Sequence, residues 1–181
     1  MELGLAKFFD APQGAVPVWE NVVGTVMKKG IRLGRGMVWD DLTAGAWFHT
    51  AGRTITEADL SSFCNLTWLT EELFTNAAER EDMVMKGRVV PGALVYSFAE
   101  GLLMPFMQGT GLAFLNAQVD VKAPTCVGDT IHLECEVDEL RPTSKRDRGL
   151  VRTTNHVINQ RGETVMIYTP LRLLRRREPS A

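Results

Sequence analysis

The stretch that decides the fold is Val89-Val90-Pro91-Gly92-Ala93-Leu94-Val95-Tyr96-Ser97-Phe98-Ala99-Glu100-Gly101-Leu102-Leu103-Met104-Pro105. Pro91 suits the first turn of a helix, because its φ is already helical and its missing N–H would have no partner there. Apolar residues then cover most of the helical circumference, as in helices that are buried on all sides. We therefore predict a central buried helix that opens at Pro91-Gly92 and ends near Pro105.

After this helix the hydrophobic period changes to two, which is the period of a half-buried strand. We predict strands at residues 112–121, 130–137, 150–158 and 164–174. Residues 146–149 and 160–163 have the charged, glycine-containing composition of hairpin turns. One buried helix followed by antiparallel strands predicts an α+β fold, with a curved antiparallel sheet wrapped around the helix.

The segment before the helix holds a further strand and a short helix. Residues 46–55 contain aromatic and β-branched side chains and are predicted to form one strand. Thr56, with Asp59 three residues later, has the spacing of a capping box, so a short helix should begin there. Residues 65–88 are predicted to be short helical turns and loops.

The chain divides into three predicted parts. Residues 1–35 form an N-terminal helical extension, with an amphipathic helix at about residues 17–29. Residues 36–177 form the α+β domain, and residues 178–181 are a tail. The basic run at residues 175–177 is expected to be solvated, and the alternative is that it contacts a phosphate.

Composition excludes several classes of function. The 181 residues are 45% apolar and 23% charged, with a net charge of −2, as in an ordinary soluble domain. That charge gives no reason to expect nucleic acid or an anionic membrane as a partner. Three cysteines without a Cys-x-x-Cys pair, and the lack of a signal-like start, favour a cytoplasmic protein. Three widely spaced histidines argue against a metal site.

Six short segments in a fixed order resemble the MaoC-like dehydratase family, which includes the (R)-specific enoyl-CoA hydratases and has the hot-dog fold. The segments are Trp39-Asp40-Asp41-Leu42, Arg53-Thr54-Ile55-Thr56-Glu57-Ala58-Asp59, Val90-Pro91-Gly92, Lys122-Ala123-Pro124-Thr125 with Val127-Gly128-Asp129-Thr130, Glu139-Leu140-Arg141-Pro142-Thr143-Ser144-Lys145 and Asn159-Gln160-Arg161-Gly162-Glu163. The resemblance implies a hot-dog domain that acts on acyl thioesters of CoA or of acyl carrier protein. It also implies a homodimer or higher even oligomer with sites between subunits, and no cofactor other than the CoA of the substrate.

In active members of that family, an Asp and a His five positions later hold water and move its proton, and the N-terminal amide of the central helix receives the thioester oxygen. Gly92 fits that amide, because negative charge that develops on the oxygen is stabilised there and a missing Cβ permits close approach. The alternative for Gly92 is that it lets the helix enter a crowded core. Val90 precedes it and is a candidate ligand contact.

The chain departs from the family pattern at the two catalytic positions. Alignment on Phe63 and Leu66-Thr67 places Leu69 at the Asp position and Phe74 at the His position. A shift of four residues places Asn65 and Thr70 there instead. Neither pair can perform the usual acid–base chemistry, so Leu69 and Phe74 remain candidates for ligand contact only.

Several other residues are candidates for the missing chemistry. Glu71 and Glu72 could act as acid or base if partly buried beside Trp68 and Phe74, and the alternative is two solvated loop acids. Glu100 could serve a thioesterase, although it lies about 12 Å along the helix from Gly92. If they line the groove, Asn116, Lys122 and Arg141 are candidates for contact with CoA phosphates or pantetheine, and the alternative is that they are surface residues.

The leading prediction is a hydratase or dehydratase with altered or lost chemistry. The alternatives are a thioesterase that uses Glu100, a non-catalytic acyl-CoA-binding protein, and a structural subunit that needs a catalytically complete partner.

Overall fold

The computed structural model describes residues 34–78, 85 and 87–177. The predicted helix at residues 17–29 and the tail at residues 178–181 lie outside these residues. The described residues form one antiparallel sheet and a set of helices, of which α3 (Gly92–Leu102) is the central one. None of the helices in this part of the chain has the length and apolarity needed to cross a bilayer.

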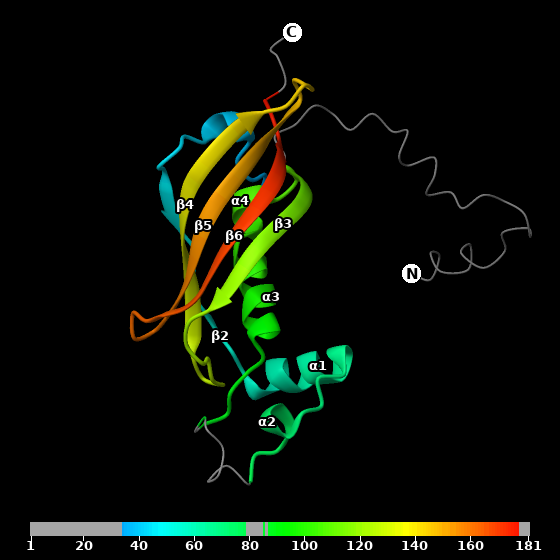
Figure 1. Ribbon diagram of the computed structural model, residues 1–181, viewed down its shortest axis with the longest axis vertical. Helices are drawn as coiled ribbons and strands as arrows, with labels where there is room; N and C mark the ends of the chain where they lie inside the picture. Colours follow the sequence, from blue (N-terminus) through cyan, green and yellow to red (C-terminus); the bar gives the residue numbers. More distant parts are fainter. Residues whose placement is uncertain (1–33, 79–84, 86, 178–181) are drawn as a thin grey trace, which may run out of the picture. The chain divides into compact units, whose positions relative to one another are not determined.

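The sheet has the strand order β1-β4-β5-β6-β3, and β2 also pairs with β4 (Figure 1). All pairings are antiparallel. The strands are β1 (Trp47–His49), β2 (Arg53–Thr54), β3 (Gly111–Val121), β4 (Thr130–Pro142), β5 (Arg148–Asn159) and β6 (Thr164–Arg175). The remaining helices are a 3₁₀ turn η3 (Trp39–Asp41), α1 (Glu57–Thr67), α2 (Glu72–Thr75) and α4 (Met104–Met107).

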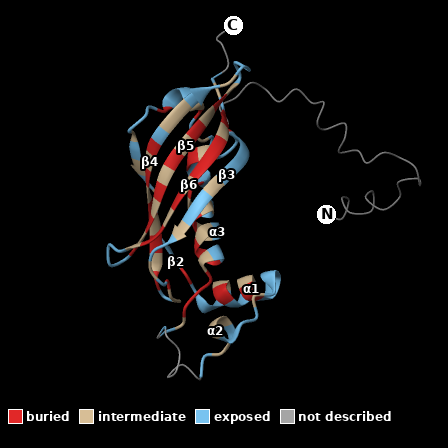
Figure 2. Cartoon of the chain, in the orientation of Figure 1, coloured by how far each residue is buried: buried red, intermediate tan, exposed pale blue. Residues whose placement is uncertain are grey.

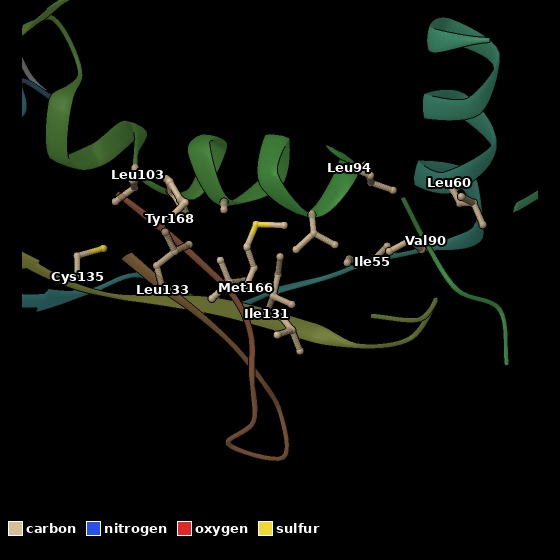
Figure 3. Close-up of a cluster of buried hydrophobic side chains, with 14 of the residues drawn as sticks. Ile55, Leu60, Val90, Leu94, Leu103, Ile131, Leu133, Cys135, Met166 and Tyr168 are labelled. Carbon is tan, nitrogen blue, oxygen red and sulfur yellow. The ribbon is translucent and has the colours of Figure 1, made fainter. Parts of the chain in front are cut away.

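The core lies between α3 and the three middle strands of the sheet (Figure 3). The buried face of α3 contributes Leu94, Val95 and Ala99, each no more than 2% exposed. Opposite them, β4, β5 and β6 contribute Ile131, Leu133, Cys135, Val157, Met166 and Tyr168. Burial alternates strictly along most of β4 and β5, which is why their period of two was visible in the sequence. The predicted α+β architecture, with one central helix on a curved antiparallel sheet, is confirmed.

The predicted single strand at residues 46–55 is wrong, because β1 and β2 are separate. Both strands pair with β4, but the pairing register shifts by one residue between them. The Thr50 hydroxyl accepts a hydrogen bond from the Leu133 amide at 3.0 Å, and a side-chain oxygen thereby replaces a backbone acceptor. The one-residue shift in register means that the segment between β1 and β2 holds one extra residue relative to β4, as in a β-bulge. The strand is interrupted there.

Strand β4 is longer than predicted and continues to Pro142. A shift in register between Val137 and Glu139 marks a second bulge, after which residues 139–142 pair with residues 149–152. The predicted turn at residues 146–149 is therefore displaced, because Arg148 already belongs to β5. The turn at residues 160–163 is confirmed, with Gly162 at a φ of 78°.

A buried carboxylate, Asp129, joins two loops at one end of the sheet, the loop before β4 and the turn between β5 and β6. It accepts hydrogen bonds from the Cys126 amide at 2.8 Å, from Gln160 at 2.7 Å and from Arg161 at 2.9 Å. Burial raises the pKa of Asp129. The three hydrogen bonds together lower it by more than burial raises it, so the pKa lies below its ordinary value. Ionisation of the Asp129 carboxyl group therefore stabilises the folded state.

We expect Asp129→Asn to lower the free energy of unfolding at pH 7 by about 1–3 kcal/mol, because buried donors lose a charged acceptor. A pKa that is lowered on folding stabilises the protein above the unfolded-state value of about 3.9, and this stabilisation is lost as the pH falls through the folded-state pKa. Urea unfolding measures the difference in free energy of unfolding between the wild type and the variant. This difference should become smaller as the pH falls from about 5 to about 3.

The matched control is Asp120→Asn, whose half-exposed carboxylate lies 4.0 Å from Lys122. It should change the free energy of unfolding by no more than about 0.5 kcal/mol at either pH. A difference for Asp129→Asn that does not change with pH would contradict the stabilising role of its charge.

Candidate functional site

The first turn of α3 presents unbonded amides at one end of the sheet. The Pro91 carbonyl caps the helix and accepts from the Leu94 amide at 2.9 Å and the Val95 amide at 3.2 Å. Within the described part of the chain, no acceptor bonds the amides of Gly92 or Ala93, as expected for the first positions of a helix. Gly92 is half-buried and Ala93 is exposed, so both donors face accessible space at the positive end of the helix dipole.

Gly92 also allows α3 to approach the edge strand β3 closely. A Cβ at Gly92 would lie 3.2 Å from Cγ2 of Val121 and 4.0 Å from Cε of Met166. The first contact is tight, but Val121 is 61% exposed and can yield. Packing and ligand access are therefore both physical reasons for glycine at this position, and they can be separated by experiment.

Val90 holds the start of α3 in place from within the core. Its side chain is only 7% exposed, and its amide donates to the Thr125 carbonyl at 2.9 Å. Val89 forms an isolated bridge with Cys126 just before it. The structure thus gives Val90 a packing role beside Gly92.

The segment aligned with the family's catalytic pair runs from the connection after α1, which holds Leu69, into α2, which holds Phe74. Thr56 and Asp59 form the predicted capping box of α1, and α1 ends at Trp68 in the left-handed conformation, with φ 61°. Leu69 follows half-buried, and Phe74 packs partly against the core cluster. Two apolar side chains, rather than a proton donor and acceptor, occupy these places.

The carboxylates of this segment are accessible to solvent. Glu71 caps α2 and Glu72 is its first residue, and both are exposed. Trp68, expected to cover them, is itself 85% exposed. An acid–base role for Glu71 or Glu72 was expected only if the carboxylate was partly buried. In the isolated chain neither carboxylate is buried.

Glu100 is engaged by a buried arginine that sequence reasoning missed. Its carboxylate pairs with the guanidinium of Arg172 on β6, and Arg172 is only 3% exposed. The sequence contains one indication of this ion pair, because Arg172 is a single charged residue within the apolar run Leu171-Arg172-Leu173-Leu174. Because Arg172 already occupies one carboxylate oxygen, Glu100 is poorly placed to act as a free base for a thioesterase.

The structure separates the three candidates for contact with CoA. Lys122 directly follows Val121 and therefore lies near Gly92, with its side chain half exposed. Asn116 is exposed in the middle of β3. Arg141 pairs with Glu139 at 2.9 Å on β4. It lies eight residues, or about 26 Å along the strand, beyond Leu133, a β4 residue of the core that includes α3. Of the three, Lys122 is the one brought toward the start of α3.

In the basic run at the end of the domain, Arg175 and Arg177 are exposed, as predicted, and Arg176 and Arg177 also form ion pairs. Arg176 donates to Asp40 at 2.9 Å through Nε, and Arg177 pairs with Asp41. The hydrogen bond from Arg176 is the largest of several that hold the pKa of Asp40 below its ordinary value. These contacts tie the end of β6 to η3 and leave Arg176 little capacity for a phosphate.

The three histidines lie in strands, and His49 of β1 lines a pocket with Gly101 and Leu102 at the C-terminal end of α3, away from its free amides. His132 is 3.9 Å from Glu134, and the ring of His156 stacks on Trp47 with centroids 6.4 Å apart. Among the described residues, no three His, Cys, Asp or Glu side chains form a group that could hold a metal ion.

Comparison with known proteins identifies the family. Residues 43–168 match the family model described as the FAS1-like dehydratase domain region. An (R)-specific enoyl-CoA hydratase of Rhodospirillum rubrum is 30% identical over 93 residues, which cover 51% of this chain and 65% of that enzyme. The chain therefore belongs to the FAS1-like dehydratase family, within the MaoC-like hydratases and dehydratases.

Solved structures confirm the hot-dog fold. A MaoC-like dehydratase from Rhodospirillum rubrum aligns with a TM-score of 0.68 at 23% identity, over 79% of this chain and 99% of that one. A Mycobacterium tuberculosis protein with a double hotdog fold aligns with a TM-score of 0.70 at 22% identity, over 83% of this chain and 47% of that one. This chain thus corresponds to one hot-dog unit of the double-hotdog protein.

The variant Gly92→Val tests the start of α3. Valine adds a branched side chain beside the free amides, so we expect the affinity for an acyl-CoA to fall at least about tenfold, or about 1.4 kcal/mol. The helix should survive, because valine adopts helical dihedrals and has a higher helix propensity than glycine. Calorimetric titration with butyryl-CoA and the melting temperature of the same sample give the two readouts.

The control is Ser97→Val, an exposed position further along the same helix. It introduces the same branched side chain into α3 away from the free amides, and its affinity should match the wild type. Unchanged affinity in Gly92→Val would remove this amide from the site, and a collapse of its melting temperature would assign the glycine to packing alone.

Proposed function

We propose that this protein binds acyl thioesters of CoA or of acyl carrier protein at the start of α3, with the thioester oxygen on the amides of Gly92 and Ala93. The observation that carries the proposal is that these two donors are unbonded among the described residues and lie beside the apolar edge strand β3. Donors fixed at a helix N-terminus stabilise an oxygen on which negative charge develops. No cofactor beyond the CoA of the substrate is required.

The usual acid–base pair is replaced in this proposal. Hydration of a conjugated thioester needs a group that activates water and one that delivers a proton, and such catalysis contributes about 10²–10⁴-fold. Leu69 and Phe74 can do neither, and their apolar side chains suit contact with an acyl chain instead. The protein is therefore proposed to be a hydratase-family member with weakened or lost hydratase activity.

The second candidate is a subunit whose site is completed by another hot-dog domain. The exposed apolar side chains at the end of α1 favour it, because Leu66 is 82% exposed and Trp68 85% exposed, and another chain could cover both. A partner that supplies the missing acid and base would restore hydration. Recovery of such a partner with this chain, together with hydratase activity that neither shows alone, would distinguish this candidate.

Crotonyl-CoA distinguishes these activities in one experiment. Hydration removes the enoyl absorbance, hydrolysis releases a thiol, and binding alone does neither. We expect the isolated protein to bind crotonyl-CoA and to hydrate it at least about 100-fold more slowly than an ordinary hydratase. Hydration at ordinary rates would contradict the loss of chemistry.

In that case Glu71→Gln and Glu72→Gln identify the replacement. A loss of about 100-fold in either variant would assign the acid–base role to that carboxylate. Full rate in both would show that neither takes part. Release of a thiol that is lost in Glu100→Gln would instead support a thioesterase.

We further propose that the protein forms a dimer through β3. Most of this edge strand is exposed (Figure 2). Five of its large apolar side chains are 40–61% exposed, namely Leu112, Phe114, Leu115, Val119 and Val121. An unpaired apolar edge is usually covered by another chain, and a two-fold dimer covers both edges at once. Sedimentation at micromolar concentration should give a dimer or an even multiple, and Val119→Lys should shift it toward monomer. A monodisperse wild-type monomer would contradict the proposal.

A further inference from the structure

Trp68, at the C-terminal end of α1, has a backbone conformation that suits glycine better than tryptophan. Its φ of 61° and ψ of 25° are left-handed, and it is the only described residue other than glycine with a positive φ. Helices that end in this conformation usually carry Gly there, and sometimes Asn, because a Cβ lies too close to the following carbonyl oxygen. A bulky residue held in a strained conformation points to a role for its side chain.

The indole of Trp68 has no partner within its own chain. Trp68 is 85% exposed, and among the described residues its side chain forms neither a hydrogen bond nor a ring contact. The two other tryptophans in this part of the chain differ. Trp39 donates to the Leu150 carbonyl at 2.9 Å, and the ring of Trp47 stacks on His156. The contact that explains Trp68 therefore lies outside the isolated chain.

The apolar face of α1 is longer than the part that its own domain covers. Leu60 and Cys64, four positions apart, are 0% and 4% exposed, whereas Trp68, four positions further on, faces solvent. Residues 65–68 are all exposed, and Leu66 reaches 82%. In Figure 1 this end of α1 projects beyond the edge strand β3, and in Figure 2 it has the colour of exposed residues. The end of α1 thus offers an apolar surface on the side of the open sheet edge.

A mostly apolar cavity opens at the start of β3. Its volume is about 350 Å³, and its larger lining side chains are Met104, Met107, Leu112 and Phe114, with Glu100 and Arg172 as a polar wall. Met104, Leu112 and Phe114 are 40–49% exposed, so the cavity is open to solvent. A cavity of about 150 Å³ already holds a benzene molecule, so this one has room for an indole ring.

Antiparallel pairing of two β3 strands brings the end of α1 and this cavity together. Helix α1 packs at the start of α3, where Leu60 joins Leu94 in the core (Figure 3). Val121, at the end of β3, adjoins Gly92 in the same place, whereas the cavity lies beside Leu112 at the start of β3. In a two-fold dimer through β3 the end of one strand lies opposite the start of the other. The end of each α1 then lies at the cavity of the second copy.

The size of Trp68 also favours a second copy as its partner. A buried tryptophan contributes about 150–250 Å², so the exposed Trp68 amounts to roughly a fifth of the about 800 Å² that each partner buries in a standard interface. The five apolar side chains of β3 are only 40–61% exposed. Trp68 therefore adds an aromatic anchor that the strand alone lacks, and such anchors dominate the affinity of most interfaces.

Resting on the proposed dimer, we infer that Trp68 of each protomer inserts into the cavity between α4 and β3 of a second copy of this chain. The indole is exposed and its backbone strained in the isolated chain because its contact is on the other protomer. Since Leu69 directly follows Trp68, the same contact holds the segment that carries Leu69 and Phe74.

Sedimentation equilibrium tests this contact through the dissociation constant of the dimer. Trp68→Gly should weaken the dimer at least about 100-fold, because an anchoring side chain is lost twice per dimer. Met104→Ser, in the cavity wall, should weaken it about tenfold alone but less than about twofold in the Trp68→Gly background, because both changes remove one contact. The matched control is Trp47→Ser, an exposed tryptophan of β1 at the opposite edge of the sheet. It should change the dissociation constant less than about twofold.

Unfolding in urea separates this role from one within the chain. Glycine holds a φ of 61° without strain, so at a dilution where both proteins are monomeric the free energy of unfolding of Trp68→Gly should be no lower than that of the wild type. A lower value would show that the indole stabilises its own chain and would overturn the inference. A dimer that Val119→Lys weakens but Trp68→Gly leaves intact would also overturn it, as would effects of Trp68→Gly and Met104→Ser that add in full. A monomeric wild type would instead contradict the proposed dimer itself.

Discussion

The packing of α3 along the inner face of the sheet is the constraint on which the rest of the molecule depends. Its buried side chains, Leu94, Val95 and Ala99, fix the helix against β4, β5 and β6. Burial of Leu94 and of Val95 stabilises the fold by about 1.5–3 kcal/mol each. Once this face is fixed, the direction of α3 is fixed as well. The free amides of Gly92 and Ala93 must then lie at one end of the sheet, and Glu100 must meet Arg172 toward the other.

The same packing leaves β3 incomplete. Helix α3 covers the middle strands, while the side chains of β3 that face the helix remain half exposed. This edge has two consequences, since it provides an apolar path beside the free amides and a surface that another chain can cover. Binding and assembly are therefore proposed to share one surface.

The sequence was sufficient for features that depend on local pattern. The central helix and the long strands follow from their hydrophobic periods, and the capping box of Thr56 and Asp59 follows from spacing alone. Family resemblance then supplied the hot-dog fold. The interruption at Thr50 was not predictable, because it depends on a hydrogen bond to Leu133, 83 positions away. The extension of β4 beyond Val137 likewise requires a bulge that no local pattern marks.

The site was predicted less completely than the fold, for the same reason. Gly92 was placed correctly at the start of α3 because its neighbours Pro91 and Ala93 define that start. The pairing of Glu100 with Arg172 joins residues 72 positions apart and gave only the faint signal of one arginine in an apolar strand. Arg141 was grouped with the ligand site by motif alone, whereas strand β4 carries it to the far end of the sheet.

The central claim, that the amides of Gly92 and Ala93 hold the thioester oxygen, is tested most directly by the backbone NMR signals of the protein during a titration with decanoyl-CoA. The amide protons of Gly92 and Ala93 should move downfield as the complex forms, because each gains an acceptor. Those of Leu94 and Val95, already bonded to the Pro91 carbonyl, should move less. Saturable binding that leaves the Gly92 and Ala93 signals unchanged would contradict the account.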